Sequence, residues 1–248
     1  MVRTTILALA LMGLVWMAKG REIPSNLKSL YNEVKSKRCS NPLSGEFEDG
    51  HAGWVYCGDR LESDGIIYIT GPSSSRPLAD MDISCDGEDN LAGDCANDGS
   101  GESQTAFKHL VQEYGISDLN PNKHTFVVLG NAGGNPHWMP DDGAGVEPLS
   151  LVAVVCNDRL IYGVWGDTNG GTLTGEASIS LAKMCFPDEH VTGDSGHTDH
   201  DVLYVAFRGK DAVPGADGAQ WRVDDAEEFE SSLANVGNRL VSRISGSV

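Results

Sequence analysis

The spacing of apolar residues along the chain predicts three amphipathic helices. In residues 25–37 the apolar side chains recur at helical spacing, and Leu27, Leu30, Tyr31 and Val34 fall on one face. The same spacing recurs in residues 103–114 and again from Asp225 onward. Ser25 is the predicted N-cap of the first helix, and Gly115 is the predicted stop of the second.

Short runs of β-branched and aromatic residues predict strands between these helices. They occupy residues 54–57, 66–70, 81–85, 124–130, 149–156, 160–166 and 202–207. Asn157-Asp158 favours a hairpin turn between two of them. The Gly- and Asp-rich stretch 86–101 and the stretch 131–148 are predicted loops. Because strands and helices do not alternate regularly, we expect an α+β fold with a mainly β core.

The first twenty residues follow a different pattern. Arg3 gives a basic start, residues 5–17 are almost wholly apolar, and Ala18 and Gly20 supply the small residues of a cleavage site. The apolar run is shorter than a comfortable membrane span. We therefore predict a secretory signal in residues 1–20 and a single domain in residues 21–248, exported to the extracellular space without a membrane anchor.

The cysteines predict a disulfide framework. All of them lie beyond the predicted signal, at Cys39, Cys57, Cys85, Cys95, Cys156 and Cys185. An even number on an exported chain favours three bridges, although six cysteines allow about fifteen pairings. Cys85 and Cys95 are the simplest local pair, across a short loop. The spacing C-x-x-C is missing from the sequence, so a zinc ribbon or a thioredoxin-like site is not favoured.

The chain is strongly acidic. It has 36 Asp and Glu against 18 Lys and Arg, a net charge of −18. Removal of residues 1–20 takes away Arg3 and Lys19 and no acid, so the exported chain is more negative still. Such a surface repels nucleic acid and anionic membranes and attracts a polycation. Because acidic surfaces also serve solubility alone, the charge does not identify a partner by itself.

Two carboxylates stand out in the stretch 162–186, which reads YGVWGDTNGGTLTGEASISLAKMCF. The pattern predicts a strand ending at Asp167, a Gly/Thr loop, and a helix that starts near Glu176 and is capped by Ser178. Two acids on rigid elements suit glycosidic cleavage, in which one protonates the leaving oxygen and the other activates water or attacks. In the alternative interpretation both residues are structural: the Asp167 side chain would accept a hydrogen bond within a turn, and Glu176 would stabilise the start of a helix.

The order of short motifs resembles the fungal chitosanases of glycoside hydrolase family 75. The strongest block is Tyr162-Gly-Val-Trp-Gly-Asp-Thr-Asn-Gly-Gly171 with Gly175-Glu-Ala-Ser-Ile-Ser-Leu-Ala182. The other blocks are Tyr56-Cys-Gly-Asp59, Met81-Asp-Ile-Ser-Cys-Asp-Gly87, Cys95-Ala-Asn-Asp98, Tyr114-Gly-Ile-Ser-Asp-Leu119, Pro148-Leu-Ser150, Val154-Val-Cys-Asn157, Cys185-Phe-Pro187 and Lys210-Asp-Ala-Val-Pro-Gly215. The resemblance covers most of residues 21–248 and includes all six cysteines.

The resemblance implies an endo-acting chitosanase whose single catalytic domain is residues 21–248. It implies hydrolysis of β-1,4 bonds between glucosamine units, inversion at the anomeric carbon, and Asp167 and Glu176 as the two essential acids. The order of strand, Asp, Gly-rich loop, acid and helix is also similar to double-psi β-barrel enzymes, which include some cellulases and lytic transglycosylases. This fold-level likeness implies a six-stranded double-psi-like β-barrel with flanking helices, stabilised by disulfides.

Five further residues are predicted to bind the substrate. Asp82 and Asp86 flank Cys85, so a disulfide there would hold their carboxylates in place to pair with glucosamine ammonium groups. Asn169 lies in the loop between the two acids. The rings of Tyr162 and Trp165 offer surfaces for stacking on sugars, although Trp165 on its strand is equally suited to the core.

We expect neither a metal ion nor a cofactor, and we expect a monomer. The acidic residues of the segment 80–98 do not match a calcium-binding loop, and His197 and His200 lie in a Gly/Asp-rich stretch where exposed imidazoles are common. Two rival functions stay open at this point. One is hydrolysis or lysis of another cell-wall polysaccharide, and the other is non-catalytic, expansin-like binding of a polysaccharide.

Overall fold

The computed structural model describes residues 20–73 and 75–246, and within these residues nine strands form one sheet. Their bounds are β1 (Phe47–Glu48), β2 (Ala52–Cys57), β3 (Ile66–Thr70), β4 (Ala79–Ser84), β5 (Phe126–Asn131), β6 (Leu151–Cys156), β7 (Arg159–Asn169), β8 (Glu176–Ser178) and β9 (His197–Phe207). The predicted mixed α+β class with a mainly β core is confirmed. All but the last residue of the predicted secretory signal lie outside the described part of the chain.

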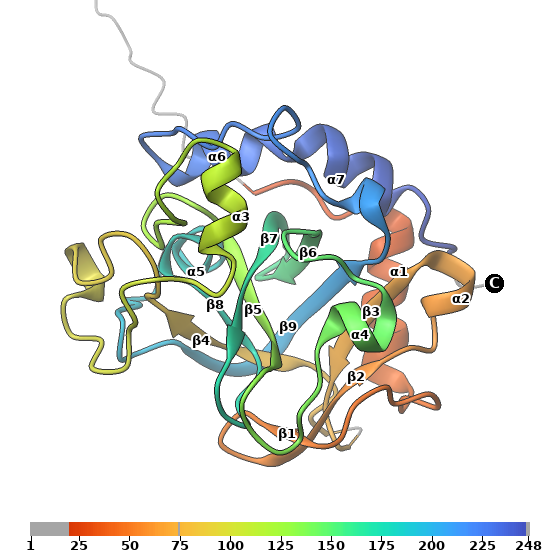
Figure 1. The fold of residues 1–248 in the computed structure, drawn as a ribbon. Coiled ribbons are helices and arrows are strands. Elements are labelled where there is room, and N and C mark those ends of the chain that lie inside the picture. Colours follow the sequence, from red (N-terminus) through yellow and green to blue (C-terminus); the bar gives the residue numbers. More distant parts are fainter. Residues whose placement is uncertain (1–19, 74, 247–248) are drawn as a thin grey trace, which may run out of the picture.

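Helices surround the sheet (Figure 1). They are α1 (Ser25–Ser36), α2 (Leu61–Asp64), α3 (Lys108–Glu113), α4 (Pro140–Ala144), α5 (Ile179–Cys185), α6 (Ala226–Ser232) and α7 (Ala234–Val241). Figure 1 shows α6 and α7 lying along one side of the sheet, where α7 packs on β6 and α6 on β7. Among the described residues, none of these helices has both the length and the apolar character needed to cross a membrane.

The strand order brings distant parts of the chain together. It runs β1-β2-β3-β9-β4-β8-β5-β7-β6, and β9 pairs with β6 as well. The pairings therefore lead from β9 through five other strands and back to β9. The β4–β8 and β5–β7 pairs are parallel, and the other pairs are antiparallel. As a result β5 lies between β7 and β8, the two strands that carry the predicted catalytic acids.

The central strands are buried on both faces. Every residue of β5 and β6 is buried, as are the residues of β7 from Leu160 to Asp167. The sequences of these strands are continuous apolar runs, because one face of each strand points into the core and the other face is covered by helices. On the outside, α1 adds Leu27, Leu30 and Val34 to the same core.

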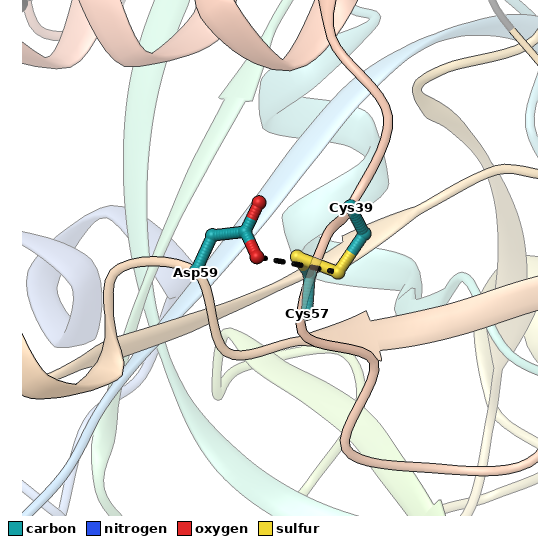
Figure 2. Close-up of side chains that lie close together, drawn as sticks. All are labelled: Cys39, Cys57 and Asp59. Carbon is teal, nitrogen blue, oxygen red and sulfur yellow. Dashed lines mark hydrogen bonds between the residues drawn. A yellow bond between two sulfur atoms is a disulfide. The ribbon is translucent and has the colours of Figure 1, made fainter.

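All six cysteines are paired, so the predicted set of three disulfides is confirmed. The bridges are Cys39–Cys57, Cys85–Cys95 and Cys156–Cys185, with the predicted local pair among them. Figure 2 shows Asp59 beside the first bridge. Its carboxylate accepts hydrogen bonds from the backbone N–H groups of Ser40 (3.0 Å) and Asn41 (2.7 Å). Both sulfur atoms are used in the bridge. The bridge and the Asp59 carboxylate therefore hold in place the segment of the chain that follows α1.

The predicted hairpin is confirmed, and most strand predictions hold. Asn157 and Asp158 join β6 to β7 with φ values of 46° and 56°, the left-handed pair that suits a tight hairpin. Two strands were missed because they are too short to show an alternating pattern: the two-residue β1 and the three-residue β8. In β9, the polar start from His197 to Asp201 also escaped prediction, because its pairing with β4 is set by tertiary contacts.

The helix predictions need correction at their ends. The predicted helix 103–114 forms only as α3, because Thr105 donates through its N–H (3.0 Å) and hydroxyl (2.6 Å) to the carboxylate of Asp118, which holds the preceding segment in a turn. The helix from Asp225 is confirmed at its capped start but breaks near Leu233 into α6 and α7. In α1 the N-cap position belongs to Pro24, and Ser25 is the first helical residue.

The smallest and the largest disulfide loops predict different stability losses. Cys85 and Cys95 are 10 residues apart, and Cys156 and Cys185 are 29 apart. Replacing both cysteines of a bridge with alanine should lower the free energy of unfolding by about 2.7 kcal/mol for the first bridge and about 3.6 kcal/mol for the second, because a longer closed loop removes more entropy from the unfolded chain. Urea denaturation under non-oxidising, non-reducing conditions measures both losses. A larger loss for the Cys85–Cys95 pair would contradict this account.

Candidate active site

A polar cavity of about 280 Å³ opens beside the ends of β7 and β8. Residues from β4, β5 and β7 line one side, and residues of the segment 98–106 line the other. Among its described lining residues are the acids Asp86, Asp98, Glu102, Asp167 and Glu176. A cavity lined by this much negative charge is suited to a ligand that carries positive charge.

The strand register places the two predicted catalytic acids on either side of one valine. Val128 of β5 is the register partner of Asp167 on the parallel strand β7. It is also the partner of Glu176 on the antiparallel strand β8, and all three residues line the cavity. Adjacent strands lie about 4.8 Å apart, so the two backbones are about 9–10 Å apart across β5. The acids therefore face one cavity with room between them.

Glu176 occupies a strand, so its predicted position at the start of a helix is wrong. β4 pairs with residues 176–178 and β5 pairs with residues 176–177, and these pairings keep the segment extended. The helix α5 begins only after Ser178, which is confirmed as its cap because its hydroxyl accepts from the N–H of Leu181 (3.4 Å). The same hydroxyl accepts from the N–H of Phe126 (3.0 Å) on β5.

The loop between the acids is held against β1. Glu48 donates its N–H to the carbonyl of Thr172 (2.9 Å) and accepts at its own carbonyl from the N–H of Thr174 (2.9 Å). The hydroxyl of Thr172 also donates to the Glu48 carboxylate (2.6 Å). Gly175 follows with φ +93°, and a Cβ atom there would lie 3.1 Å from Oδ1 of Asp80. Small residues thus let this loop lie flat between β1 and β4.

Asp167 is buried and held by backbone groups. Its Oδ1 accepts from the N–H groups of Ala106 and Thr168, both at 2.8 Å, and the residue is only 4% exposed. Burial raises the pKa of Asp167 to about 8, and the negative charge of Asp86 adds to this rise. The hydrogen bonds from Ala106 and Thr168 act in the opposite direction, because they favour the charged form.

Asp86 and Asp167 both line the cavity, and their carboxyl groups interact with each other. The side-chain interaction between them raises the pKa of Asp167. Burial raises the pKa of Asp86, and the interaction with Asp167 acts in the opposite direction and lowers it. Asp86 is in turn held by the N–H of Glu102, which donates to its Oδ1. Two adjacent acids of this kind titrate as a pair.

Glu176 is surrounded by negative charge. Although part of the residue is exposed, burial of its carboxyl, together with the negative charges of Asp82, Asp86 and Asp167, raises its pKa to about 8. Asn169 donates its side-chain N–H to Oε2 of Glu176. Both catalytic candidates can therefore hold a proton near neutral pH, which general acid catalysis requires.

Of the three polar residues predicted to bind the substrate, two line the cavity and one lies beside it. Asp86 and Asn169 line the cavity. Asp82 is the register partner of Glu176 on β4 and lies beside it, outside the cavity lining. Burial raises the pKa of Asp82, and the negative charge of Asp49 adds to that rise. Asp82 is thus placed to act on Glu176 through its charge.

The predicted stacking roles of Trp165 and Tyr162 are wrong, because both rings are fully buried. The Trp165 indole N–H donates to the carbonyls of Leu129 (3.0 Å) and Asp167 (2.8 Å). The buried ring therefore supports the backbone of Asp167 from the core side. The Tyr162 hydroxyl donates to Asn238 of α7 (3.0 Å).

The helix α7 closes over the Tyr162 ring, which explains its burial. A Cβ atom on Gly237 would lie 2.5 Å from that ring, so only glycine permits this packing. The backbone N–H of Tyr162 donates to the buried carboxylate of Glu230 on α6 (2.9 Å), which also accepts from Arg21. Tyr162 is a core residue that anchors two helices.

Three lining groups were missed by the interpretation of the sequence. Asp98 belongs to the acidic segment 80–98, but the sequence does not show in which direction its side chain points. Glu102 lies just past that run and lines the same wall of the cavity. The N–H of Ala106, which binds Asp167, is a backbone group that leaves no signal in the sequence.

Comparison with known proteins assigns the family. The family model described as fungal chitosanase of glycosyl hydrolase group 75 matches residues 81–243. An endo-chitosanase of Aspergillus fumigatus is 50% identical over 233 residues, covering 92% of this chain and 94% of that protein. Endo-chitosanase B of Aspergillus oryzae (strain ATCC 42149 / RIB 40) is 46% identical over 241 residues, covering 96% of each chain. The chain therefore belongs to the fungal chitosanases of glycosyl hydrolase group 75 and is an endo-acting glycoside hydrolase.

Proposed function

We propose that this chain is a secreted endo-chitosanase that hydrolyses β-1,4 bonds between glucosamine units of chitosan with inversion at the anomeric carbon. The family match and the names of its relatives support the substrate. The net charge of −18 and the acid-lined cavity support it independently, because chitosan is a polycation. In this proposal residues 1–20 are the secretory signal and residues 21–248 are one catalytic domain that acts as a monomer.

The observation that carries the mechanism is the shared register partner of the two acids. Asp167 and Glu176 lie on opposite sides of Val128, with strand spacing of about 9–10 Å between their backbones. Inverting glycosidases hold their carboxyl groups about 6.5–9.5 Å apart to admit a water molecule, whereas retaining enzymes need about 5 Å. Two acids separated by a whole strand favour the inverting arrangement.

Glu176 is the proposed general acid. Its pKa of about 8 keeps it protonated at neutral pH, and the charges of Asp82 and Asp86 maintain that state. It can then protonate the leaving glycosidic oxygen as the bond to the anomeric carbon breaks. Asn169, which donates to Oε2, orients the carboxyl group.

Asp167 is the proposed general base. Ammonium groups of the substrate bring positive charge to Asp86, Asp98 and Glu102 in the cavity, and this charge favours the ionised form of Asp167. The Asp167 carboxylate then takes a proton from water as the water attacks the anomeric carbon. Ala106 and Thr168 hold that carboxylate in position.

We further propose that the cycle of strands β9, β4, β8, β5, β7 and β6 is a six-stranded double-psi-like β-barrel. Two parallel pairs within that cycle support this interpretation, as does the loop that joins β7 to β8 between the catalytic residues. In this arrangement the cavity lies at the barrel end reached by the final residues of β7.

The decisive experiment is hydrolysis of chitosan by the purified protein of residues 21–248. Rapid appearance of reducing ends, with a steep early fall in viscosity, is expected because the enzyme is endo-acting. Chitin, cellulose and peptidoglycan in parallel assays should release far fewer reducing ends. A protein that binds chitosan without producing reducing ends would instead support an expansin-like role, and preferred hydrolysis of another of these polymers would overturn the proposed substrate.

The amides of the two acids should be nearly inactive. Asp167→Asn and Glu176→Gln each remove a proton-transfer group while keeping the shape, so each should lower kcat by at least about 100-fold. Chitosan binding should be kept, because the other acids of the cavity are intact. Asp188→Asn, an exposed acid, is the matched control and should retain the parent rate. A Glu176→Gln protein with the parent kcat would show that Glu176 is not the acid.

The first product should have inverted configuration. Proton NMR of the anomeric region during the first minutes of hydrolysis should show the α-anomer before mutarotation sets in, since the substrate bond is β. Initial appearance of the β-anomer would mean a retaining mechanism and a covalent intermediate, which the separation of the strands disfavours.

The alkaline side of the pH profile should respond to Asp82. Glu176 must be protonated to act, so activity falls as the pH rises through its pKa of about 8. Asp82→Asn removes the strongest negative neighbour of Glu176, lowers that pKa and should move the alkaline limb of kcat/KM to lower pH. Because parent and variant act on the same chitosan, titration of the substrate cancels in the comparison. An alkaline limb that stays in place or moves up would contradict the assignment, and Asp188→Asn is again the control.

A further inference from the structure

A second polar cluster lies beside the loop that leads to Glu176. One carboxylate oxygen from each of Asp49 and Asp80 and a ring nitrogen of His200 lie within 4.8 Å of one another. Asp49 follows β1, Asp80 lies on β4, and His200 lies on β9, so three separate strands meet there. Asp49 and Asp80 are each only 7% exposed.

The carboxylate of Asp80 lacks a partner that such burial requires. Its Oδ1 is buried and accepts no hydrogen bond from the described residues. A buried, unpaired carboxylate is unfavourable unless a cation or a donor compensates it. His200 does not compensate it, because its Nε2 lies 2.8 Å from Oδ2 of Asp49 and is directed there. The cluster therefore holds more acceptor atoms than donors.

We propose that Asp49, Asp80 and His200 bind a divalent transition-metal ion, with zinc favoured. Two carboxylates and one imidazole are ligands that zinc accepts, with water or a further side chain completing four-fold coordination. His51 is within reach as that further ligand, because its Nδ1 lies 3.9 Å from Oδ1 of Asp49. Calcium is disfavoured, because it takes six to eight oxygen ligands and the cluster offers an imidazole.

The surroundings of the cluster favour an ion that stabilises rather than one that reacts. The His200 ring stacks on Trp54 at 5.5 Å, so the orientation of the imidazole is set by packing. Asp49, Asp80 and His200 are all outside the lining of the acidic cavity. A bound ion would connect the ends of three strands in a part of the molecule that the substrate does not need to reach.

The position of the site links it to the catalytic loop. Glu48, the neighbour of Asp49, makes the backbone hydrogen bonds that hold Thr172 and Thr174. Gly175, the neighbour of Glu176, lies against Oδ1 of Asp80. An ion shared by Asp49 and Asp80 would therefore fasten the loop 172–175 from both sides. This role is independent of which polysaccharide the enzyme hydrolyses.

Metal binding is tested on the purified protein after dialysis against a chelator and then against metal-free buffer. Calorimetric titration with zinc chloride should give one ion per chain, and zinc should raise the thermal midpoint, since a ligand that binds only the folded state stabilises it. Calcium chloride should bind at least about tenfold more weakly. Absence of zinc binding at one ion per chain overturns the proposal, and so does equal binding of calcium.

Three variants locate the ion. Asp80→Asn and His200→Gln should each reduce zinc affinity at least about tenfold and abolish the rise in thermal midpoint, because each removes one of three ligands. His197→Gln is the matched control, because this imidazole lies on the same strand between the carboxylates of Glu189 and Asp201. It should keep zinc binding. Loss of zinc binding in His197→Gln, or its retention in the other two variants, places the ion elsewhere and overturns the proposal.

The metal-free variants separate a binding role from a folding role. Without zinc, Asp80→Asn should be at least as stable as the parent, because it removes a buried carboxylate whose Oδ1 has no hydrogen-bond partner among the described residues. Zinc should then stabilise the parent alone. If metal-free Asp80→Asn is less stable than the metal-free parent, the carboxylate has a protein partner that replaces the ion, and the proposal fails.

Discussion

The pairing of β5 with β7 on one side and with β8 on the other is the constraint on which the site depends. β5 runs parallel to β7 and antiparallel to β8, so the late part of β7 and the start of β8 meet at the same residue, Val128. Asp167 and Glu176 consequently face one cavity although a Gly-rich loop separates them in sequence. A shift of one residue in either register would turn one acid to the other face of the sheet.

The candidate site gathers acidic side chains whose carboxyl groups are largely buried. Burial and mutual repulsion raise the pKa values of Asp167 and Glu176 to about 8, so both favour the protonated state until positive charge arrives. Hydrogen bonds from Ala106, Thr168 and Asn169 fix the geometry without neutralising the acids. In the proposed mechanism a cationic polymer supplies the missing charge and thereby shifts the protonation of the two acids.

The same few residues connect the site to the rest of the fold. Trp165 supports the backbone of Asp167 from the core, Ser178 joins β5 to the start of α5, and Glu48 holds the loop that leads to Glu176. The Cys85–Cys95 bridge fixes the chain next to Asp86. In the proposed mechanism the stability of the fold and catalysis are therefore coupled, because the groups that orient the two acids are themselves part of the sheet or of its covering helices.

The sequence by itself determined the α+β class, most strands, the Asn157-Asp158 hairpin, the cysteine framework and the family, because these depend on local periodicity, turn chemistry and short motifs. It also singled out Asp167 and Glu176. Only the tertiary structure decided that Glu176 lies on a strand, that Trp165 and Tyr162 are buried, and that Asp98, Glu102 and the Ala106 N–H line or support the site. Those properties depend on which strands pair and which face a helix covers, and contacts between residues far apart in the chain set them.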